Sequence, residues 1–258
     1  MILARLAHAI RTQNWFAVAL EFVIVIAGVV IGFQVTAWNG AREAAARAEI
    51  LTERLIADLR AEQWRVEGTS LYSAQVADNA QRALDALEGR RTVDDETLVI
   101  EAFRATQIFS FPVIRTTYNE LVSTGTVDLI KDADLIAAAV EYYETGSGEI
   151  SLEDPARPYR YAFYRLADRA LYDALADTCA EPRLLEIGDY AALPQILDYP
   201  CEIDGHDVAI AAVAERLRAS EAIIPLLRQR AIETSVDSRQ DYWQNLFDRI
   251  LPPAPGSE

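Results

Sequence analysis

The hydrophobic pattern of the chain is dominated by a single apolar run near the N-terminus. Between Trp15 and Trp38 the chain carries one carboxylate, Glu21, one amide, Gln34, and no basic residue. A helix rises about 1.5 Å per residue, so a run of this length can cross a hydrocarbon core of about 30 Å. The pattern therefore predicts one transmembrane helix over residues 15–38.

Beyond this run, helical periodicity continues over most of the chain. Residues 41–87 contain no proline and a single glycine, Gly68, and apolar side chains recur on one helical stripe. The stripe contains Ile50, Leu51, Leu55, Ile56 and Leu59. The membrane helix is therefore expected to run directly into a second long helical stretch.

Start and stop signals predict several further helices. Acidic residues and threonines mark helix starts, and glycine marks a stop. The expected helices are one over 93–107, one from Thr116 or Thr117 to Gly125, one opened by Asp132 or Asp134, one from Pro155 or Pro158 to about Asp177, and one from Asp207 to about Ile250. The last helix has apolar residues at a spacing that resembles a coiled coil, although Pro225 predicts a kink or a restart near Ile224.

No strand pattern of comparable strength accompanies these helices, although residues 190–199 can hold a short extended piece. We expect an all-α fold in which the transmembrane helix continues into a long helix, followed by a helical bundle against which a long C-terminal helix packs back. The expected division is a cytoplasmic N-terminus at 1–14, a transmembrane helix at 15–38, a helical extracytoplasmic domain at 39–251 and a disordered tail at 252–258.

The residues that flank the apolar run predict its orientation. Arg5, His8 and Arg11 precede it without any acid, whereas acids and bases alternate behind it. Because basic residues mark the cytoplasmic side, we expect a bacterial inner-membrane protein with its N-terminus in the cytoplasm and its bulk in the periplasm. A signal peptide cleaved after Ala37 is the alternative, but signal peptides use shorter apolar cores of about 7 to 15 residues.

The overall charge narrows the range of partners. The chain has 40 acidic and 24 basic residues, which gives a net charge of −16. Such a surface repels nucleic acid and anionic lipid head groups, so no nucleic-acid partner is expected. The acidic excess also keeps an exported domain soluble, which accounts for it without a binding role.

Cys179 and Cys201 are the two cysteines of the chain. In an oxidising compartment an even number of cysteines predicts a disulfide, here closing a loop that contains proline and glycine. Constraining the unfolded chain in this way is worth about 3 kcal/mol. Two free buried thiols are the alternative.

Two stretches of the chain carry distinctive residues. The apolar run has Glu21-Phe22, Gly28, Gln34 and Trp38-Asn39, and residues 117–135 read TYNELVSTGTVDLIKDADL. Both stretches resemble a bacterial family of single-pass membrane proteins of unknown function, although residues 19–20 and 35–37 depart from the family pattern. The likeness covers the N-terminal third and residues 117–143. It implies a membrane topology but no mechanism, because the family has no assigned activity.

Polar and small residues inside the apolar run are the strongest functional signal. Glu21, Gly28 and Gly32 fall on one helical face, because their offsets are close to whole turns. An acid in a membrane is costly and usually faces protein or water, and small residues let two helices approach closely. We therefore expect the span to self-associate with Glu21 at the interface. The alternative is that Glu21 reaches the cytoplasmic head groups.

The remaining marked residues of the run have simpler interpretations. Trp15, Trp38 and Asn39 stand at its two ends, where tryptophan anchors a helix at the lipid interface. Gln34 lies on a different face from Glu21. It can reach the outer head groups beside Trp38 or recruit another helix.

Beyond the apolar run the chain has no recognisable reaction motif. Residues 201–207 gather a thiol, carboxylates and an imidazole, but their spacing fits neither a zinc nor a calcium site, so no metal or other cofactor is expected. Asp204 or Asp207 there is better explained as a helix cap. Nucleophile motifs and phosphate loops are also missing from the sequence, so no catalytic residue is assigned and we do not expect an enzyme.

Arginines and tyrosines alternate over residues 157–172. Arg157, Arg160, Tyr161 and Arg165 are candidate anion-binding residues, because such side chains can converge on a carboxylate. The simpler interpretation is a core helix that packs through its tyrosines and pairs with acidic neighbours.

Two functions are consistent with these features. In the first, the protein is a noncatalytic membrane module whose periplasmic domain binds a protein or a ligand, and whose span makes a homo-oligomer in the lipid bilayer. In the second, several spans assemble around Glu21 into a channel or a membrane-perturbing structure.

Overall fold

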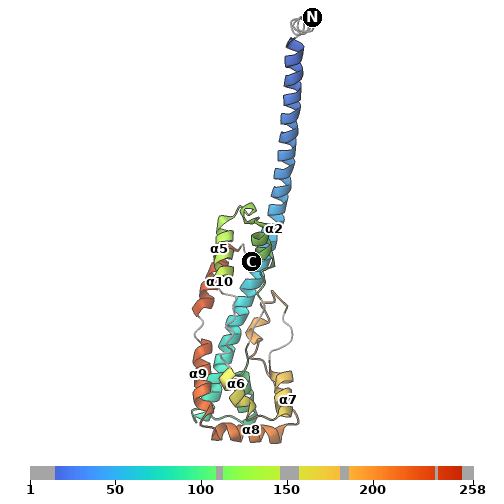
Figure 1. The fold of residues 1–258 in the computed structure, drawn as a ribbon. Helices are drawn as coiled ribbons and strands as arrows, with labels where there is room; N and C mark the ends of the chain where they lie inside the picture. The colour runs from blue at the N-terminus through green and yellow to red at the C-terminus, as the bar shows by residue number, and fades with distance from the viewer. Residues whose placement is uncertain (1–14, 109–112, 146–156, 181–185, 236–237, 252–258) are drawn as a thin grey trace, which may run out of the picture.

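The fold is helical throughout the part of the chain that the computed structural model describes, which is residues 15–108, 113–145, 157–180, 186–235 and 238–251, without a strand among them (Figure 1). The elements are α2 (Trp15–Leu87), α3 (Asp95–Arg104), α4 (Thr116–Thr124), the 3₁₀ turn η1 (Val127–Leu129), α5 (Ala133–Glu144), α6 (Arg157–Tyr164), α7 (Arg169–Cys179), the 3₁₀ turn η2 (Leu193–Gln195), α8 (Asp207–Ala219), α9 (Ile223–Ser235) and α10 (Ser238–Ile250). The expected all-α class is confirmed. The expected cytoplasmic segment at 1–14 and the tail at 252–258 lie outside the described residues.

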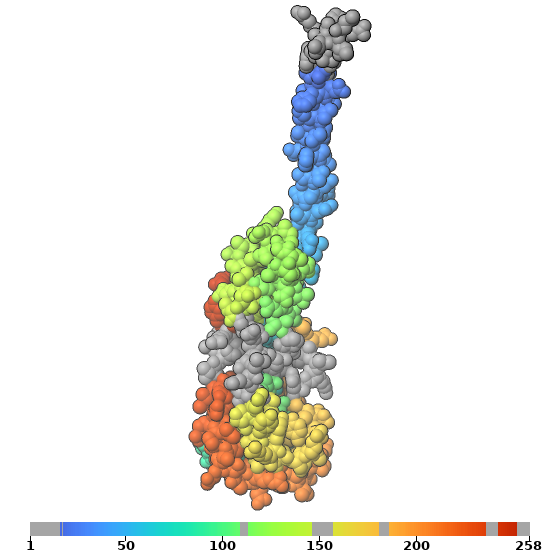
Figure 2. All heavy atoms as spheres, viewed as in Figure 1, coloured from blue at the N-terminus to red at the C-terminus, as the bar shows by residue number. Residues whose placement is uncertain are grey.

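Helix α2 is the axis of the molecule. It runs for 73 residues without a break, which corresponds to a length of about 110 Å. Nearly every described side chain from Phe16 to Arg47 is exposed, and burial begins at Ala48. Figure 2 shows the consequence: the first half of α2 stands clear of the rest as a bare rod, and the second half passes into a helical body. The expected fusion of the apolar run with the following helix is therefore confirmed.

The body packs around α2 in successive apolar clusters. Next to the bare rod, the stripe that contains Leu51, Leu55 and Leu59 packs against α4, α5 and α10. At the far end, residues around Ala80 and Leu84 pack against α3 and the helices α6 to α9. Each fully buried leucine or aromatic side chain contributes about 1.5 to 3 kcal/mol. Burial on α2 therefore holds both ends of the body to one helix.

The C-terminal part of the chain returns along α2, as expected, but as three helices rather than one. Helix α8 lies across the far end of the body, and α9 and α10 then run back towards the bare rod (Figure 1). The first break falls at residues 220–222 and the chain restarts at Ile223, because Pro225 is accommodated in the first turn of a helix, where no backbone N–H is required. The restart expected near Ile224 is confirmed.

The helix expected from residue 155 or 158 to 177 is wrong as a continuous element. Residues 165–168 separate α6 from α7. Asp168 caps α7, because its side chain accepts a hydrogen bond of 2.9 Å from the Leu171 backbone nitrogen. Asp132 caps α5 in the same way, as expected, whereas α4 follows Arg115 and has no side-chain cap from a threonine. Residues 190–199 form turns and η2 instead of an extended piece.

Candidate functional site

One helix in the described residues, α2, is long and apolar enough to cross a membrane. Its most apolar window has a mean hydropathy of 2.4 and is 0% buried in the rest of the protein. Large side chains such as Phe16, Ile24, Ile31 and Phe33 are exposed there. A contiguous apolar surface of this extent is unusual for a soluble monomer and marks a site of interaction.

The face expected to mediate self-association is open in the single chain. Glu21, Gly28 and Gly32 are all exposed. A Cβ atom built at either glycine would meet nothing within 4 Å. The glycines are therefore not needed for packing within one copy. The structure leaves the face accessible, and the pairing itself stays a prediction.

The C-terminal end of the apolar segment leads into an exposed stalk, residues 39–47 of α2. Trp38 is 65% exposed, and the guanidinium of Arg42 lies over its ring at 5.9 Å from the centroid. Gln34 and Asn39 are exposed as well, while the side chain of Trp15 lies outside the description. Where the stalk joins the body, Arg54 forms an ion pair of 2.9 Å with Glu120 of α4. The helical stalk thus separates the apolar segment from the body.

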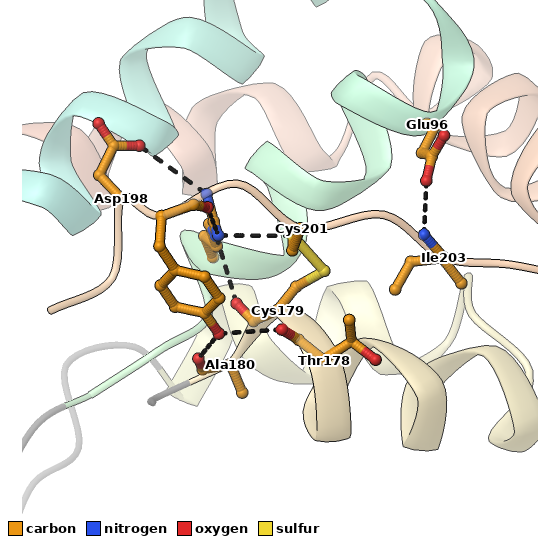
Figure 3. The surroundings of a disulfide bond; sticks show 9 residues. Glu96, Thr178, Cys179, Ala180, Asp198, Cys201 and Ile203 are labelled. Carbon is orange, nitrogen blue, oxygen red and sulfur yellow. Dashed lines mark hydrogen bonds and ion pairs between the residues drawn. A yellow bond between two sulfur atoms is a disulfide. The ribbon is translucent and has the colours of Figure 1, made fainter. Parts of the chain in front are cut away.

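The structure joins Cys179 and Cys201 in a disulfide (Figure 3), so the alternative of free thiols does not hold in this structure. The bond links the end of α7 to the segment before α8. Cys179 is fully buried. Close by, the Ile203 backbone nitrogen donates to Glu96 of α3 over 2.7 Å. The disulfide therefore holds the loop-rich segment before α8 against the far end of the body.

Arg104 organises the surroundings of this disulfide. Its guanidinium donates to the backbone oxygens of Cys179 and Tyr199, at 3.2 and 2.6 Å. It also lies over the Tyr199 ring, 4.9 Å from the centroid. Burial lowers the pKa of Arg104, while Tyr199 and Asp198 act in the opposite direction. The arginine satisfies carbonyls that the irregular loop leaves without helical partners.

A buried polar network that the sequence did not predict lies in the near half of the body. Glu62 of α2 and Tyr142 of α5 are both 0% exposed, and Arg65 is 8% exposed. Arg65 donates to Glu62 over 2.8 Å and to the Tyr142 hydroxyl over 2.5 Å, and that hydroxyl donates to Glu62. The other Glu62 oxygen accepts from the Ile114 backbone nitrogen over 2.6 Å. The network ties α2, α5 and the chain before α4 together.

The candidate anion-binding set is divided by the structure. Arg160 is partly buried and donates to the Thr106 backbone oxygen over 3.1 Å, at the C-terminal end of α3. Arg157, Tyr161 and Arg165 are exposed. Arg160 is therefore engaged at the end of α3, whereas the other three residues are open to solvent. Buried Arg230 of α9 joins Arg160 by donating to Ala105 and Gln107 oxygens, so two cations cover the end of α3 where the helix dipole is negative.

A pocket of about 460 Å³ opens beside the exposed arginines and tyrosines, between α6 and α7. It is lined by Tyr164, Ala167, Asp168, Arg169, Tyr172 and Asp173. The sequence indicated the tyrosines, but it could not indicate the pocket, which depends on the break between the two helices.

Metal binding finds no support in the described ranges, where no group of three or more His, Cys, Asp or Glu side chains could hold an ion. In residues 201–207, α8 begins at Asp207 and His206 occupies the capping position without a side-chain hydrogen bond. Capping of α8 by Asp204 or Asp207 is therefore wrong.

No family model matches the chain, and no curated protein or solved structure matches it significantly.

Proposed function

We propose that this protein is a noncatalytic, single-pass protein of the bacterial inner membrane that presents a rigid helical body in the periplasm as a binding module. One observation carries the proposal. Helix α2 contains both the exposed apolar segment and the central core stripe of the body, without a break between them. Anchor and body are thus one element, and the body keeps a fixed relation to the anchor.

The dimensions support a spacing role. Ala48, where burial begins, comes ten positions after Trp38, so the helix raises the body by about 15 Å. The far end of α2 then lies about 70 Å from Trp38. A partner bound at the far end is held well away from the lipid, whereas an enzyme acting on lipid would need its site near the stalk.

The orientation rests on the basic residues ahead of the span. In spheroplasts, protease added from outside should digest the body of the full-length protein while a cytoplasmic marker stays intact. A body that resists protease until the membrane is dissolved would contradict the periplasmic placement. N-terminal sequencing of the mature protein tests the anchor separately, because a protein that begins after Ala37 would have lost it.

Self-association through the apolar segment completes the proposal. In native membranes, a cysteine placed at Gly28 or Gly32 should cross-link two copies under oxidation, whereas one placed at Val30, on another face, should cross-link far less. Equal cross-linking at all three positions, or none, would overturn the packing face. A conducting assembly is the competing function. Ion leakage from vesicles that hold the purified protein, abolished by Glu21→Ala, would favour it over a binding module.

A further inference from the structure

Helices α6 and α7 lie at the end of the body away from the bare rod, where Figure 2 is yellow. Three of their tyrosine rings are neighbours in a row. The centroids of Tyr161 and Tyr164 lie 6.2 Å apart, and those of Tyr164 and Tyr172 lie 5.0 Å apart. Tyr161 is 54% exposed and Tyr164 is 38% exposed. Tyr172 also packs edge-on against the core residue Phe103, and the centroids of the two rings lie 5.8 Å apart. Neighbouring rings meet edge to face, at interplanar angles of 68° and 80°. Tyr161 and Tyr164 therefore offer separate aromatic surfaces to solvent, and Tyr172 is partly buried beside them.

The pocket at the end of this row has a polar lining of mixed charge. Asp168 uses one oxygen to cap α7, and Arg169 donates from Nε to both oxygens of Asp173. A simple anion would meet two carboxylates here, and a simple cation would meet a guanidinium. A neutral polyol suits the lining better, because each hydroxyl can donate to Asp and accept from Arg. The volume of about 460 Å³ falls within the usual range for small-ligand sites.

Two arginines, one at each end of α6, extend this surface: Arg157 begins the helix and Arg165 follows its last residue. Arg157 and Arg165 are exposed and form no ion pair or hydrogen bond with any residue in the described ranges. Arg157, Tyr161 and Tyr164 recur at helical spacing, and Arg165 follows Tyr164 directly, so the arginines flank the tyrosine row. Arginines without a partner among the described residues are notable in a chain of net charge −16, and their fork geometry matches carboxylates.

We propose that the tyrosine row and its pocket bind a carboxylate-bearing glycan. Sugar rings lie on the tyrosines, whose flat faces pack against C–H groups, and sugar hydroxyls bond the polar lining of the pocket. Arg157 and Arg165 bind the carboxylates along the chain. Only the cellular location of this ligand, an acidic polysaccharide of the cell envelope, rests on the proposed periplasmic placement of the body.

Calorimetric titration of the purified full-length protein in detergent tests the site. The probes are an oligogalacturonate, a neutral oligogalactose of the same length and an oligoglutamate. We expect the oligogalacturonate to bind and the neutral sugar to bind more weakly. Tyr161→Ser and Arg165→Gln should each weaken oligogalacturonate binding about tenfold, because each removes one exposed contact.

Two matched substitutions elsewhere serve as controls. Tyr190→Ser and Arg249→Gln remove exposed side chains of the same types far from α6, and should leave binding unchanged. The proposal is overturned if the oligogalacturonate fails to bind at about 10 mM, or if the two control substitutions weaken its binding as much as Tyr161→Ser and Arg165→Gln do. It is also overturned if the oligoglutamate binds with the same affinity as the oligogalacturonate. That last result would identify a general acidic-peptide surface. These titrations do not depend on the side of the membrane on which the body lies. The binding proposal can therefore fail while the proposed topology holds, and the topology can fail while the binding proposal holds.

Discussion

Arg65 donates from Nε to Oε2 of Glu62 over 2.8 Å, one helical turn away, and both side chains lie inside the body. Removing two charges from water is costly unless every polar atom finds a partner. Tyr142 and the Ile114 backbone supply those partners. Burial raises the pKa of the Tyr142 phenol, so the hydroxyl keeps its proton and continues to donate.

Substitution of one member of this pair should be strongly destabilising. Glu62→Ala leaves the Arg65 charge buried without its counter-ion, and we expect a loss of about 3 to 5 kcal/mol in the free energy of unfolding. The measurement is urea denaturation of the full-length protein in detergent. The double variant Glu62→Leu, Arg65→Met should recover most of the loss, because it leaves no buried charge. A matched test is Asp173→Ala, which breaks the exposed pair with Arg169 and should cost no more than about 0.5 kcal/mol.

The disulfide should stabilise the far end of the body. Replacing both Cys179 and Cys201 by alanine frees the intervening loop in the unfolded chain and should lower stability by about 3 kcal/mol. Reduction of the native protein should produce the same shift in the unfolding midpoint, and the double variant should not respond to reductant. Identical midpoints for the oxidised and reduced native protein would contradict this role.

Acid should weaken α3 through its cap. The Asp94 carboxylate accepts from the backbone nitrogen and the hydroxyl of Thr97, at 2.7 and 2.9 Å. The bond from the Thr97 backbone is the main cause that lowers the Asp94 pKa. A carboxyl whose pKa is lower in the folded state stabilises the fold above its unfolded pKa of about 3.9, and this contribution is lost as the pH falls through the lower folded value.

Two substitutions at this cap separate charge from hydrogen bonding. Asp94→Ala should cost about 1 kcal/mol at pH 7, whereas Asp94→Asn keeps a cap and should cost less. Both variants should lose the part of the acid sensitivity that Asp94 contributes, as measured by urea unfolding at about pH 7 and pH 3. An acid response identical to that of the native protein in both variants would argue against the cap.

Arg230 should matter more than its neighbour on α9. Arg230→Met leaves the Ala105 and Gln107 carbonyls without the buried guanidinium, and we expect a loss of about 1 to 3 kcal/mol. Arg228 is exposed and pairs with Glu88. Arg228→Met should therefore cost less than about 1 kcal/mol in the same denaturation experiment. Equal losses would show that the end of α3 does not depend on Arg230.

The parts of the fold that were predictable depend on local chemistry. The unbroken run over residues 41–87 favours helix along its whole length. Gly125 ends α4 in the left-handed conformation, with φ of 65°, which glycine adopts without steric cost. The break at residues 165–168 contains neither proline nor glycine. It forms because Asp168 caps a new helix, and this cap competes with the continuation of α6.

The candidate sites were less predictable because they join distant parts of the chain. Glu62 continues the stripe of Leu55 and Leu59 at helical spacing. A charged residue on an apolar helical face is the sequence signal that indicates its burial. Its partner Tyr142 is eighty residues away and carries no local signal. In the same way, Arg160 left the candidate anion set because it faces the end of α3, which only tertiary packing decides.

If the apolar segment of α2 spans a membrane as proposed, the uninterrupted helix makes the molecule a rigid lever that pivots in the bilayer. If the membrane segment changes its tilt by about 20°, within the range that such helices adopt, the tip of the body swings sideways by about 25 Å while its height changes by only about 4 Å. The far end of such a protein can reach partners over a wide lateral range while its distance from the membrane surface stays nearly constant. Two copies joined at the base would couple their swings and narrow that range.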